Sequence, residues 1–402
     1  MKTQKPKTMW IKEKFSAMKV GIFTDTYYPN VNGVVTSIQV LEKELRVLGH
    51  EVYIFTSANK AVKEKSKNVF RFPSVPIVFY KPYRMSIWFS PRMIYKIKKL
   101  KLDVVHTQTE FSMGIFGKIM AKVFRIPMVH TYHTMYDKYV HYVANGHLIS
   151  PKMAQRLSRI FCNRADLIIA PTKKTEDSLK SYGIKKPTVV IPTGIDLEQF
   201  KKEVSDDRIQ ALKNKYKIGK DDYVVLYLGR IAKEKNIDVL INQMPYIIEK
   251  VQQAKLLIVG GGPYLQELKD LVGTLKISEK VIFTGEISHS EINEYYKLGN
   301  VFVISSNTET QGLTYLEAMS AGVPVVVRND ESYKDFIVNG ENGYIFDEPE
   351  EISHIIYRLC NDKDLDKIII ENANKSIENL SSKKFAENVI KAYETAIENK
   401  KK

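Results

Sequence analysis

Short apolar segments that alternate with helical segments place the strongest limit on how this chain can fold. They occur at residues 18–23, 52–55, 69–72, 104–106, 128–131, 167–170 and 189–191, and most are separated by stretches with helical spacing of apolar residues. Short continuous apolar runs are typical of strands buried on both faces. The alternation therefore predicts an α/β protein whose parallel sheet is covered by helices on both sides.

The length of the chain indicates more than one core. A chain of 402 residues is longer than a single hydrophobic core usually supports, so two domains are expected. Residues 192–222 are polar, rich in lysine and interrupted by glycines, and a second series of strands follows at 223–228, 255–260, 281–284 and 301–304. We therefore divide the chain into a basic tail (1–17), a first α/β domain (18–197), a second α/β domain (198–380) and a C-terminal helix (381–402).

The net charge and the cysteine content limit which kinds of binding partner and which cellular location are expected. The chain has 61 Lys and Arg against 46 Asp and Glu, a formal charge of +15, which favours an anionic lipid surface, a nucleic acid or a phosphorylated substrate. No apolar run approaches the ~18 residues of a membrane-spanning helix, and the basic N-terminus lacks the apolar segment of a secretory signal. Cys162 and Cys360 show no metal or redox spacing. We expect a cytoplasmic protein that touches the inner face of the cell membrane.

Residues 300–324, NVFVISSNTETQGLTYLEAMSAGVP, carry the main candidate site. They are expected to form a buried strand, a polar loop with Glu309, and a helix that opens near Gly312 and carries Glu317. The N–H groups of Gly312, Leu313 and Thr314 lie between the glutamates, and a helix start stabilises phosphate through such groups and its dipole. Because carboxylates accept hydrogen bonds from sugar hydroxyls, the spacing predicts a nucleotide-sugar site.

Two other strand ends carry groups that suit the same ligand. The loop GRIAKEKN after residues 223–228 places Arg230 and Lys235 between a strand and a helix, where both can bind phosphate oxygens. After the first strand, Asp25 and Tyr28 precede Gly33, which lets a ligand approach the backbone closely. Open α/β sheets bind ligands at the carboxyl ends of their strands, so we expect these groups to contribute to one site.

The two glutamates and their setting, QGLTYLEAMSAGVPVVV, resemble the E-x7-E signature of family 4 of the retaining glycosyltransferases. These enzymes have the GT-B fold, in which two Rossmann-like domains face each other across a cleft. The resemblance implies that Glu309 contacts the hydroxyls of the donor sugar and that Glu317 contacts the ribose. It also implies that Arg230 and Lys235, which match the family's G-R-x4-K pair, supply cations for the donor pyrophosphate.

The resemblance covers nearly the whole chain. It implies that the loop with Gly33 faces the donor phosphates and the acceptor, and that His133, in the segment TYHT, faces the sugar and the acceptor. It further implies that the last helix crosses back onto the first domain. The expected catalytic residues are His133, Arg230, Lys235 and Glu309, without a nucleophilic carboxylate.

The segments FTDTYYPNVNGVVTSI and HTYHTMYDKYVHY are similar to those of family members that glucosylate diacylglycerol. This resemblance implies a UDP-sugar donor, most simply UDP-glucose, a lipid acceptor, and no metal or other cofactor. One alternative is a family sibling that glycosylates phosphatidylinositol, a glycolipid or a soluble sugar. Another is a basic nucleic-acid-binding protein, although the chain contains no recognised nucleic-acid motif. No oligomeric state is predicted.

Residues 80–102 form an aromatic and basic segment that allows two interpretations. Trp88 and Phe89 precede a helix expected to start at Pro91, which carries Arg92, Lys96 and Lys99 on its polar side. The helix could simply pack its apolar side on the sheet. Alternatively, the aromatic and basic side chains form a membrane patch, at ~1 kcal/mol for each basic residue near anionic lipid. The two interpretations are compatible if only the aromatic residues ahead of the helix touch lipid.

Two short patterns are weak candidates for metal sites. The pair His130 and His133 has no carboxylate at ligand spacing, and the segment begins as a strand. Asp364 and Asp366 form a D-x-D triplet, but they occur in late helical sequence and are expected to be surface charges. We therefore expect no metal site.

Overall fold

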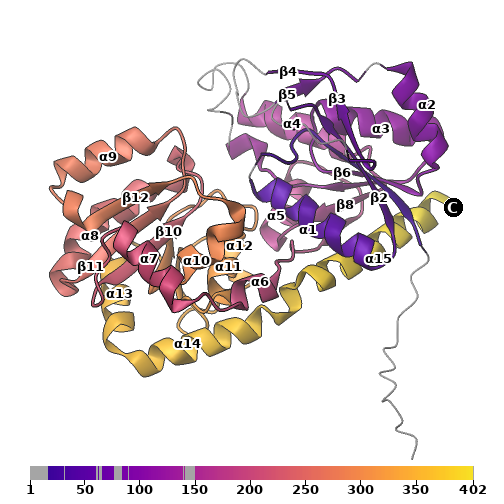
Figure 1. The fold of residues 1–402 in the computed structure, drawn as a ribbon. Helices are drawn as coiled ribbons and strands as arrows, with labels where there is room; N and C mark the ends of the chain where they lie inside the picture. The colour runs from indigo at the N-terminus through magenta and orange to yellow at the C-terminus, as the bar shows by residue number, and fades with distance from the viewer. Residues whose placement is uncertain are drawn as a thin grey trace, which may run out of the picture.

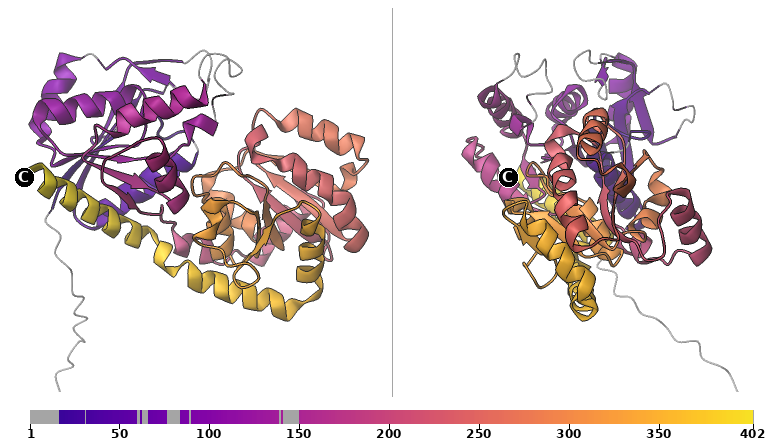
Figure 2. Two further views of the ribbon diagram at one scale, coloured as in Figure 1. Left: turned by 180° about the vertical axis from the view of Figure 1, so that it is seen from behind. Right: turned by 90° about the vertical axis from the view of Figure 1, so that its left-hand side faces the viewer.

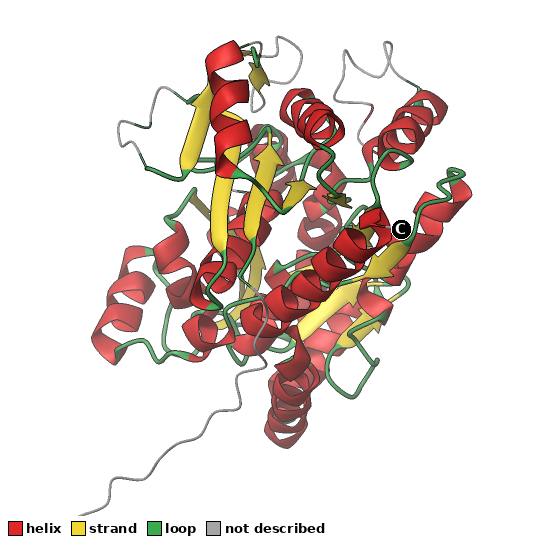
Figure 3. Ribbon diagram, turned by 90° about the vertical axis from the view of Figure 1, so that its right-hand side faces the viewer, coloured by secondary structure: helices red, strands yellow, loops and turns green. Residues whose placement is uncertain are grey.

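The structure, a computed structural model, describes residues 17–30, 32–59, 62, 66–76, 84–88, 90–138, 140 and 150–401. These residues form two lobes that lie side by side (Figure 1). Each lobe is a parallel sheet between layers of helices, which confirms the predicted α/β class and the two Rossmann-like halves (Figure 3). Residues 1–16, which make up nearly all of the expected basic tail, lie outside the described part.

The first lobe is built on a parallel sheet whose strand order reverses at β1. Within the described residues the order is β3 (Val69–Phe72), β2 (Glu51–Ser57), β1 (Lys19–Thr24), β6 (Val104–Thr107), β7 (Met128–Thr131), β8 (Leu167–Ala170) and β9 (Thr188–Val190). These strands are mostly buried on both faces because helices cover both sides. A small antiparallel pair, β4 (Ser74–Pro76) and β5 (Arg84–Ser86), lies beside this sheet and was not expected from the sequence.

Two helical layers cover the first sheet. One face carries α1 (Gly33–Val47) and α15 (Ser382–Lys401), and the other carries α2 (Pro91–Leu100), α3 (Ser112–Phe124), α4 (Pro151–Cys162) and α5 (Lys173–Ser181). Helix α1 shows why this layer forms: Val35, Ile38, Leu41 and Leu45 follow a helical repeat and are buried. Its first turn is capped by Asn32, whose Oδ1 accepts the Val35 N–H at 3.0 Å.

The second lobe repeats this plan. Within the described residues its sheet runs β12 (Val281–Gly285), β11 (Ala254–Val259), β10 (Tyr223–Leu228), β13 (Val301–Ile304), β14 (Val325–Arg328) and β15 (Tyr344–Phe346). One face packs on α8 (Ile237–Lys250), α9 (Leu265–Thr274) and α13 (Glu351–Asn361). The other packs on α6 (Leu197–Lys201), α7 (Asp206–Lys215), α10 (Ile292–Tyr296), α11 (Thr314–Ser320) and α12 (Glu331–Lys334), while α14 (Lys363–Ser376) reaches both cores.

The chain enters the second lobe slightly earlier than the predicted boundary after residue 197. Ile195, Leu197 and Phe200 are already buried in the core of the second lobe. The lysine-rich stretch from 192 to 222 is therefore not a loose linker, because its apolar positions pack α6 and α7 on that core. At the other end, α15 leaves the second lobe and runs along the first (Figure 2).

Candidate active site

The carboxyl ends of the two sheets meet at the loop after β13. Thr310 Oγ1 donates to the backbone oxygen of His133 at 2.9 Å, and Thr172 Oγ1 donates to the backbone oxygen of Thr310 at 2.7 Å. The amide of Gln311 pairs with the backbone of Thr193, at 2.8 Å and 3.0 Å. These three first-lobe residues follow β7, β8 and β9, so the first lobe holds the loop that carries Glu309.

Lys235 and Glu309 form the centre of the second-lobe part of the site. Lys235 ends the short 3-10 helix Lys233–Lys235, which follows β10, and its Nζ lies 2.5 Å from Glu309 Oε1. Both side chains are largely enclosed, at 20% and 17% exposure. The structure thus brings together two residues that are 74 positions apart in the sequence, and an ammonium group lies beside a carboxylate that can accept sugar hydroxyls.

Arg230 lies on the loop between β10 and that 3-10 helix. Its side chain is 39% exposed and makes an ion pair of 4.0 Å with Glu234, which is almost fully buried. Its backbone oxygen accepts the Tyr227 hydroxyl at 3.0 Å. Glu234 therefore contacts one side of the guanidinium. The exposed part of the guanidinium can still bind an anionic ligand.

A glycine loop fixes the backbone around Arg230. Gly260 and Gly262, after β11, have φ angles of +138° and +158°. A Cβ at either position would lie 2.0 Å from a backbone oxygen, that of Gly229 or that of Ile231. Only glycine lets the two loops pack this closely, and the Ile231 N–H donates to the backbone oxygen of Gly261 at 2.8 Å. This packing holds the Arg230 loop at the edge of the sheet.

The start of α11 lies two residues later than the predicted opening at Gly312. Gly312 takes a φ of +76°, and the helix itself runs from Thr314 to Ser320. Within the part of the chain that the structure describes, the N–H groups of Gly312, Leu313 and Thr314 donate to no protein acceptor. Their role as phosphate donors stays a prediction.

Glu317 lies inside the second lobe, in the first turn of α11. Only 5% of the residue is exposed, and the Tyr296 hydroxyl donates to its Oε2 at 2.8 Å. Burial raises the pKa of the Glu317 carboxyl to about 7. Its predicted contact with a ribose is not tested by these contacts.

His133 contacts the Glu309 loop through its backbone oxygen, which accepts Thr310 Oγ1. Its Nε2 lies 2.6 Å from Gln108 Oε1. Burial and the neighbouring His130 lower the pKa of His133 to about 3, so the ring is neutral near pH 7. Because the Gln108 oxygen can only accept, Nε2 carries the proton and Nδ1 remains an acceptor. Gln108, which sequence analysis missed, lies just after β6.

Asp25 is held by donors at the start of α3. Its carboxylate accepts Thr109 Oγ1 at 2.6 Å, the Met113 N–H at 2.9 Å, and the Ser112 hydroxyl. Asp25 is almost fully buried, and burial raises its pKa. It therefore caps the start of α3, and its predicted place on the acceptor side of the site is not tested by these contacts.

Tyr28 and Gly33 lie at the surface before and at the start of α1. Tyr28 is 56% exposed, and its backbone oxygen accepts Arg71 Nη2 at 2.7 Å. A Cβ at Gly33 would meet nothing within 4 Å. Within the described residues, no steric contact therefore requires glycine at this position. The predicted close approach of a ligand remains a reason for a glycine there.

Comparison with known proteins decides the family. Residues 31–199 match the model described as Glycosyltransferase Family 4, and residues 208–376 match Glycosyl transferases group 1. The chain is 40% identical over 331 residues to the alpha-monoglucosyldiacylglycerol synthase of Streptococcus pneumoniae, covering 82% of this chain and 75% of that protein. The protein of the same name from Acholeplasma laidlawii is 36% identical over 382 residues, covering 92% and 94%. The chain belongs to glycosyltransferase family 4.

Solved structures agree on the fold of this glycosyltransferase. Anabaena Alr3699/HepE, in complex with UDP and glucose, matches with a TM-score of 0.77 and 19% sequence identity, over 94% of this chain and 100% of that one. At this identity the likeness shows the fold alone. It confirms the GT-B architecture inferred from the sequence.

The lobes of the glycosyltransferase are also joined by an ion pair that sequence analysis missed. Lys174 Nζ lies 2.6 Å and 2.8 Å from the two carboxylate oxygens of Asp330, and 3.3 Å from the backbone oxygen of Glu309. The two side chains are only 15% and 12% exposed. Lys174 lies in the first turn of α5 of the first lobe, so it links that lobe both to Asp330, the N-cap of α12, and to the Glu309 loop.

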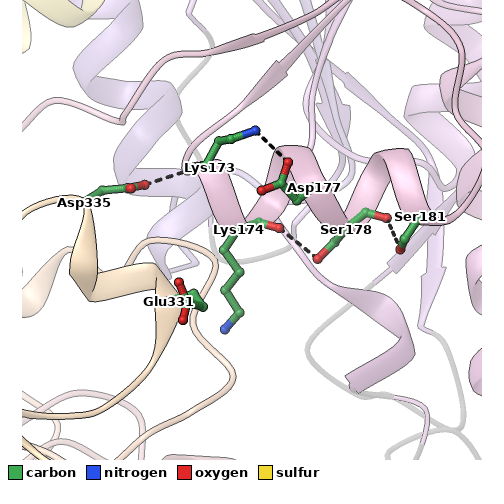
Figure 4. Close-up of a pocket in the computed structure, with 7 residues that line it drawn as sticks. All are labelled: Lys173, Lys174, Asp177, Ser178, Ser181, Glu331 and Asp335. Carbon is green, nitrogen blue, oxygen red and sulfur yellow. Dashed lines mark hydrogen bonds and ion pairs between the residues drawn. The ribbon is translucent and has the colours of Figure 1, made fainter.

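A recess of about 480 Å³ lies at the seam between α5 and α12 (Figure 4). It is lined by Lys173, Lys174, Asp177, Ser178, Ser181, Glu331 and Asp335. The Lys173 side chain turns back to Asp177 on its own helix, while its N–H donates to Asp335 across the seam at 3.0 Å. None of the donor-site residues lines this recess, so it is separate from the predicted donor site.

The described part of the segment 80–102 shows how its helix packs, and contact with a membrane stays a prediction. Trp88 stacks on Phe116 at 5.5 Å and packs against the first-lobe core, so its ring is not a free aromatic anchor. Arg92, Lys96 and Lys99 lie on the exposed side of α2, while Ile97 on the other side is buried. Phe89 lies outside the described residues. The helix packs its apolar side on the sheet, as the first of the two interpretations stated.

The candidate metal residues of the glycosyltransferase lie apart. His130 contacts Glu110 Oε1 at 3.2 Å and the Thr107 hydroxyl at 2.9 Å, away from the Gln108 contact of His133. Asp364 and Asp366 lie in the first turn of α14. Across the described ranges there is no group of three or more His, Cys, Asp or Glu residues that could hold a metal. Among the same residues, no helix has the length and apolar character to span a bilayer.

Proposed function

We propose that this glycosyltransferase moves glucose from UDP-glucose to diacylglycerol at the inner face of the cell membrane, with retention of the anomeric configuration. The observation that carries the proposal is the identity of 40% and 36% to two alpha-monoglucosyldiacylglycerol synthases over most of the chain. The geometry at the lobe junction supports it, because groups suited to a sugar, a diphosphate and an acceptor hydroxyl meet there.

In the proposed reaction, departure of UDP is the step in which negative charge develops. Arg230 and Lys235 lie on one loop and bind the diphosphate, with the N–H groups of Gly312 to Thr314 as further donors. Preorganised cations and dipoles of this kind lower a barrier by about 3–4 kcal/mol for each good donor. Glu309, already oriented by Lys235, accepts the hydroxyls of the sugar.

In this proposal, the first lobe supplies the side chain that contacts the acceptor. Neutral His133, whose Nε2 is engaged by Gln108, positions the acceptor and does not take up the proton of the attacking hydroxyl. The hydroxyl attacks from the side on which UDP departs, so configuration is retained, and the leaving phosphate takes up the proton. We assign the positive charge of the site to protein side chains, and the mechanism has no step that needs a metal.

The test is transfer by the purified full chain. UDP-glucose labelled in the sugar is incubated with vesicles that contain diacylglycerol, with and without EDTA, and the lipid product is separated and its anomeric configuration read by NMR. We expect an α-glucosyl lipid in both conditions and no product from Arg230→Glu, whose circular dichroism should match that of the wild type. Transfer only to phosphatidylinositol, a glycolipid or a soluble sugar would contradict the proposed acceptor.

A further inference from the structure

Helix α4 exposes an apolar stripe on the surface of the first lobe. Met153, Leu157 and Ile160 are 49%, 51% and 51% exposed. At about 100° per residue they fall within about 60° of one another on the helix circumference. Helices on a protein surface usually turn such a stripe inward, so this arrangement requires a reason.

The neighbouring part of the same surface is positively charged. Lys152, Arg156 and Arg159 are exposed beside the apolar stripe. The sequence has no Asp or Glu between Asp137 and Asp166. The carboxylate of Asp137 accepts Gln155 Nε2 of α4 at 3.0 Å. An apolar stripe beside three cations is complementary to a lipid surface that carries negative charge. We call Lys152, Met153, Arg156, Leu157, Arg159 and Ile160 the α4 face.

The inner side of α4 ties this face to the acceptor side of the site. Ser158 Oγ lies 3.1 Å from the Tyr132 hydroxyl, and the Phe161 ring packs edge-on against His130 at 4.9 Å. Tyr132 directly precedes His133. The α4 face is thus separated from the end of β7 by one helix diameter, about 10 Å, and by the Tyr132 side chain. A lipid hydroxyl at the bilayer surface would be within reach of that strand end.

Helix α2 is the competing surface, and its apolar residues are less available. Ile97 is buried and Trp88 packs against the core, which leaves Tyr95 as its exposed large side chain in the described range. Lys96 and Lys99 lie over the rings of Phe70 and Tyr95, at 4.5 Å and 4.8 Å. Helix α2 itself therefore offers charge without an apolar stripe, and the exposed apolar residues of this segment, Met85 and Ile87 at 54% and 56%, lie ahead of the helix.

We propose that the α4 face docks on an anionic membrane surface and thereby presents the end of β7 to lipid acceptors. The inference deepens the proposed function, because it rests on a membrane lipid as the acceptor. Met153, Leu157 and Ile160 enter the interfacial region of the bilayer, and the three cations contact lipid phosphates.

The experiment measures vesicle binding separately from glucose transfer. The full chain is sedimented with vesicles of equal parts phosphatidylglycerol and phosphatidylcholine, and with vesicles of phosphatidylcholine alone, neither of which contains diacylglycerol. Two variants of the α4 face are compared with the wild type. One carries Met153→Ser, Leu157→Ser and Ile160→Ser, and the other carries Lys152→Gln, Arg156→Gln and Arg159→Gln.

Two further variants serve as matched controls. Tyr246→Ser, Tyr357→Ser and Ile368→Ser remove side chains of the second lobe with similar exposure, 56%, 48% and 55%. Arg92→Gln, Lys96→Gln and Lys99→Gln remove three of the four charges of α2. Thermal melts verify that each variant folds, and since the changed side chains point outward, no variant should lose its cooperative transition.

We expect the wild type to bind the anionic vesicles, less tightly at high salt. Each α4 variant should lose about tenfold or more in affinity, while the second-lobe control should bind as the wild type does. Unchanged binding by both α4 variants, no binding by the wild type, or loss confined to the α2 variant would overturn the proposal. So would a dimer that the α4 variants dissociate without any change in vesicle binding. Normal vesicle binding without glucose transfer would instead contradict only the proposed function.

Discussion

Glu317 shows how a single buried carboxyl couples stability to pH. Its pKa is about 7 in the folded chain against an ordinary 4.5. Between these values the folded chain holds a proton that the unfolded chain has released, so stability falls as the pH rises. The shift corresponds to roughly 3 kcal/mol once the carboxyl is ionised in both states.

Glu317→Gln should therefore be more stable than the wild type at high pH. Glutamine has nearly the same shape, still accepts the Tyr296 hydroxyl and never ionises. We expect a gain of up to about 3 kcal/mol at pH 8 and little difference near pH 4.5. Urea denaturation at both pH values measures this gain. An equal gain at the two pH values would show that ionisation of the buried carboxyl is not its cause.

Gly33 separates the demands of the fold from those of a ligand. A Cβ at this position meets nothing within 4 Å, so Gly33→Ala should keep or raise the melting temperature, because alanine favours helices by up to ~1 kcal/mol. If donor phosphates approach this backbone as we propose, transfer should fall roughly 10- to 100-fold, since small displacements of a reactant are costly. Wild-type turnover would remove Gly33 from the site.

Gly262→Ala is the matched control for that experiment. Its Cβ would lie 2.0 Å from the Ile231 backbone oxygen. For this variant we expect a loss of stability of about 1–3 kcal/mol from the forced backbone shift. In a thermal melt, Gly33→Ala should thus keep or raise the melting temperature, whereas Gly262→Ala should lower it.

At the level of elements, the loop after β13 depends on contacts from the other lobe. Its Thr310 and Gln311 bond to strand ends of the first sheet, and Lys174 binds the backbone oxygen of Glu309 as well as Asp330. The ion pair is largely enclosed, so solvent screens it less than a surface pair. The position of Glu309 is therefore set jointly by both lobes.

Lys174→Met should raise the KM for the donor and lower kcat, because the Glu309 loop loses a tether. Asp330→Asn should have a similar effect, and the double variant should be little worse than either, with a coupling energy above about 1 kcal/mol. Lys173→Met is the control, since the Lys173 ammonium pairs with Glu176 and Asp177 of its own helix. Additive effects of the two changes would show that the pair does not act as a unit.

At the scale of the whole molecule, α15 links the two lobes. It follows the second lobe in the sequence but packs on the first lobe. Its buried residues pack on the first lobe: Phe385, Ala386, Val389, Ile390, Ala392, Tyr393 and Ala396. The Tyr393 hydroxyl also lies 2.7 Å from Nδ1 of the buried His106. The first lobe is thus completed by the end of the chain.

Deleting residues 382–402 should expose one face of the first sheet and give an aggregated chain. Tyr393→Phe should keep the helix in place and cost about 1–2 kcal/mol, because His106 loses a buried partner. Solubility and near-ultraviolet circular dichroism measure the first effect, and urea denaturation measures the second. A soluble, cooperatively melting deletion variant would show that α15 is not part of the core.

Apolar periodicity determined most of what could be predicted. The strands at 69–72, 128–131, 167–170, 223–228 and 301–304 have the expected bounds, because a strand buried on both faces needs a continuous apolar run. The short pair β4 and β5 escaped detection, since its three-residue strands are mostly exposed and carry no such run. The polar residues Arg230, Lys235 and Glu309 could also be placed in loops at strand ends, because each follows a predicted strand.

The α/β class, the two-lobe plan and the family could be inferred without coordinates, because they follow from local patterns and ordered motifs. The use of individual side chains became apparent only from the folded chain. The structure assigned Asp25 to the cap of α3 and Trp88 to the core, paired Lys174 with Asp330, and exposed the stripe on α4. Each of these depends on distances between segments far apart in the chain, and no local spacing encodes them.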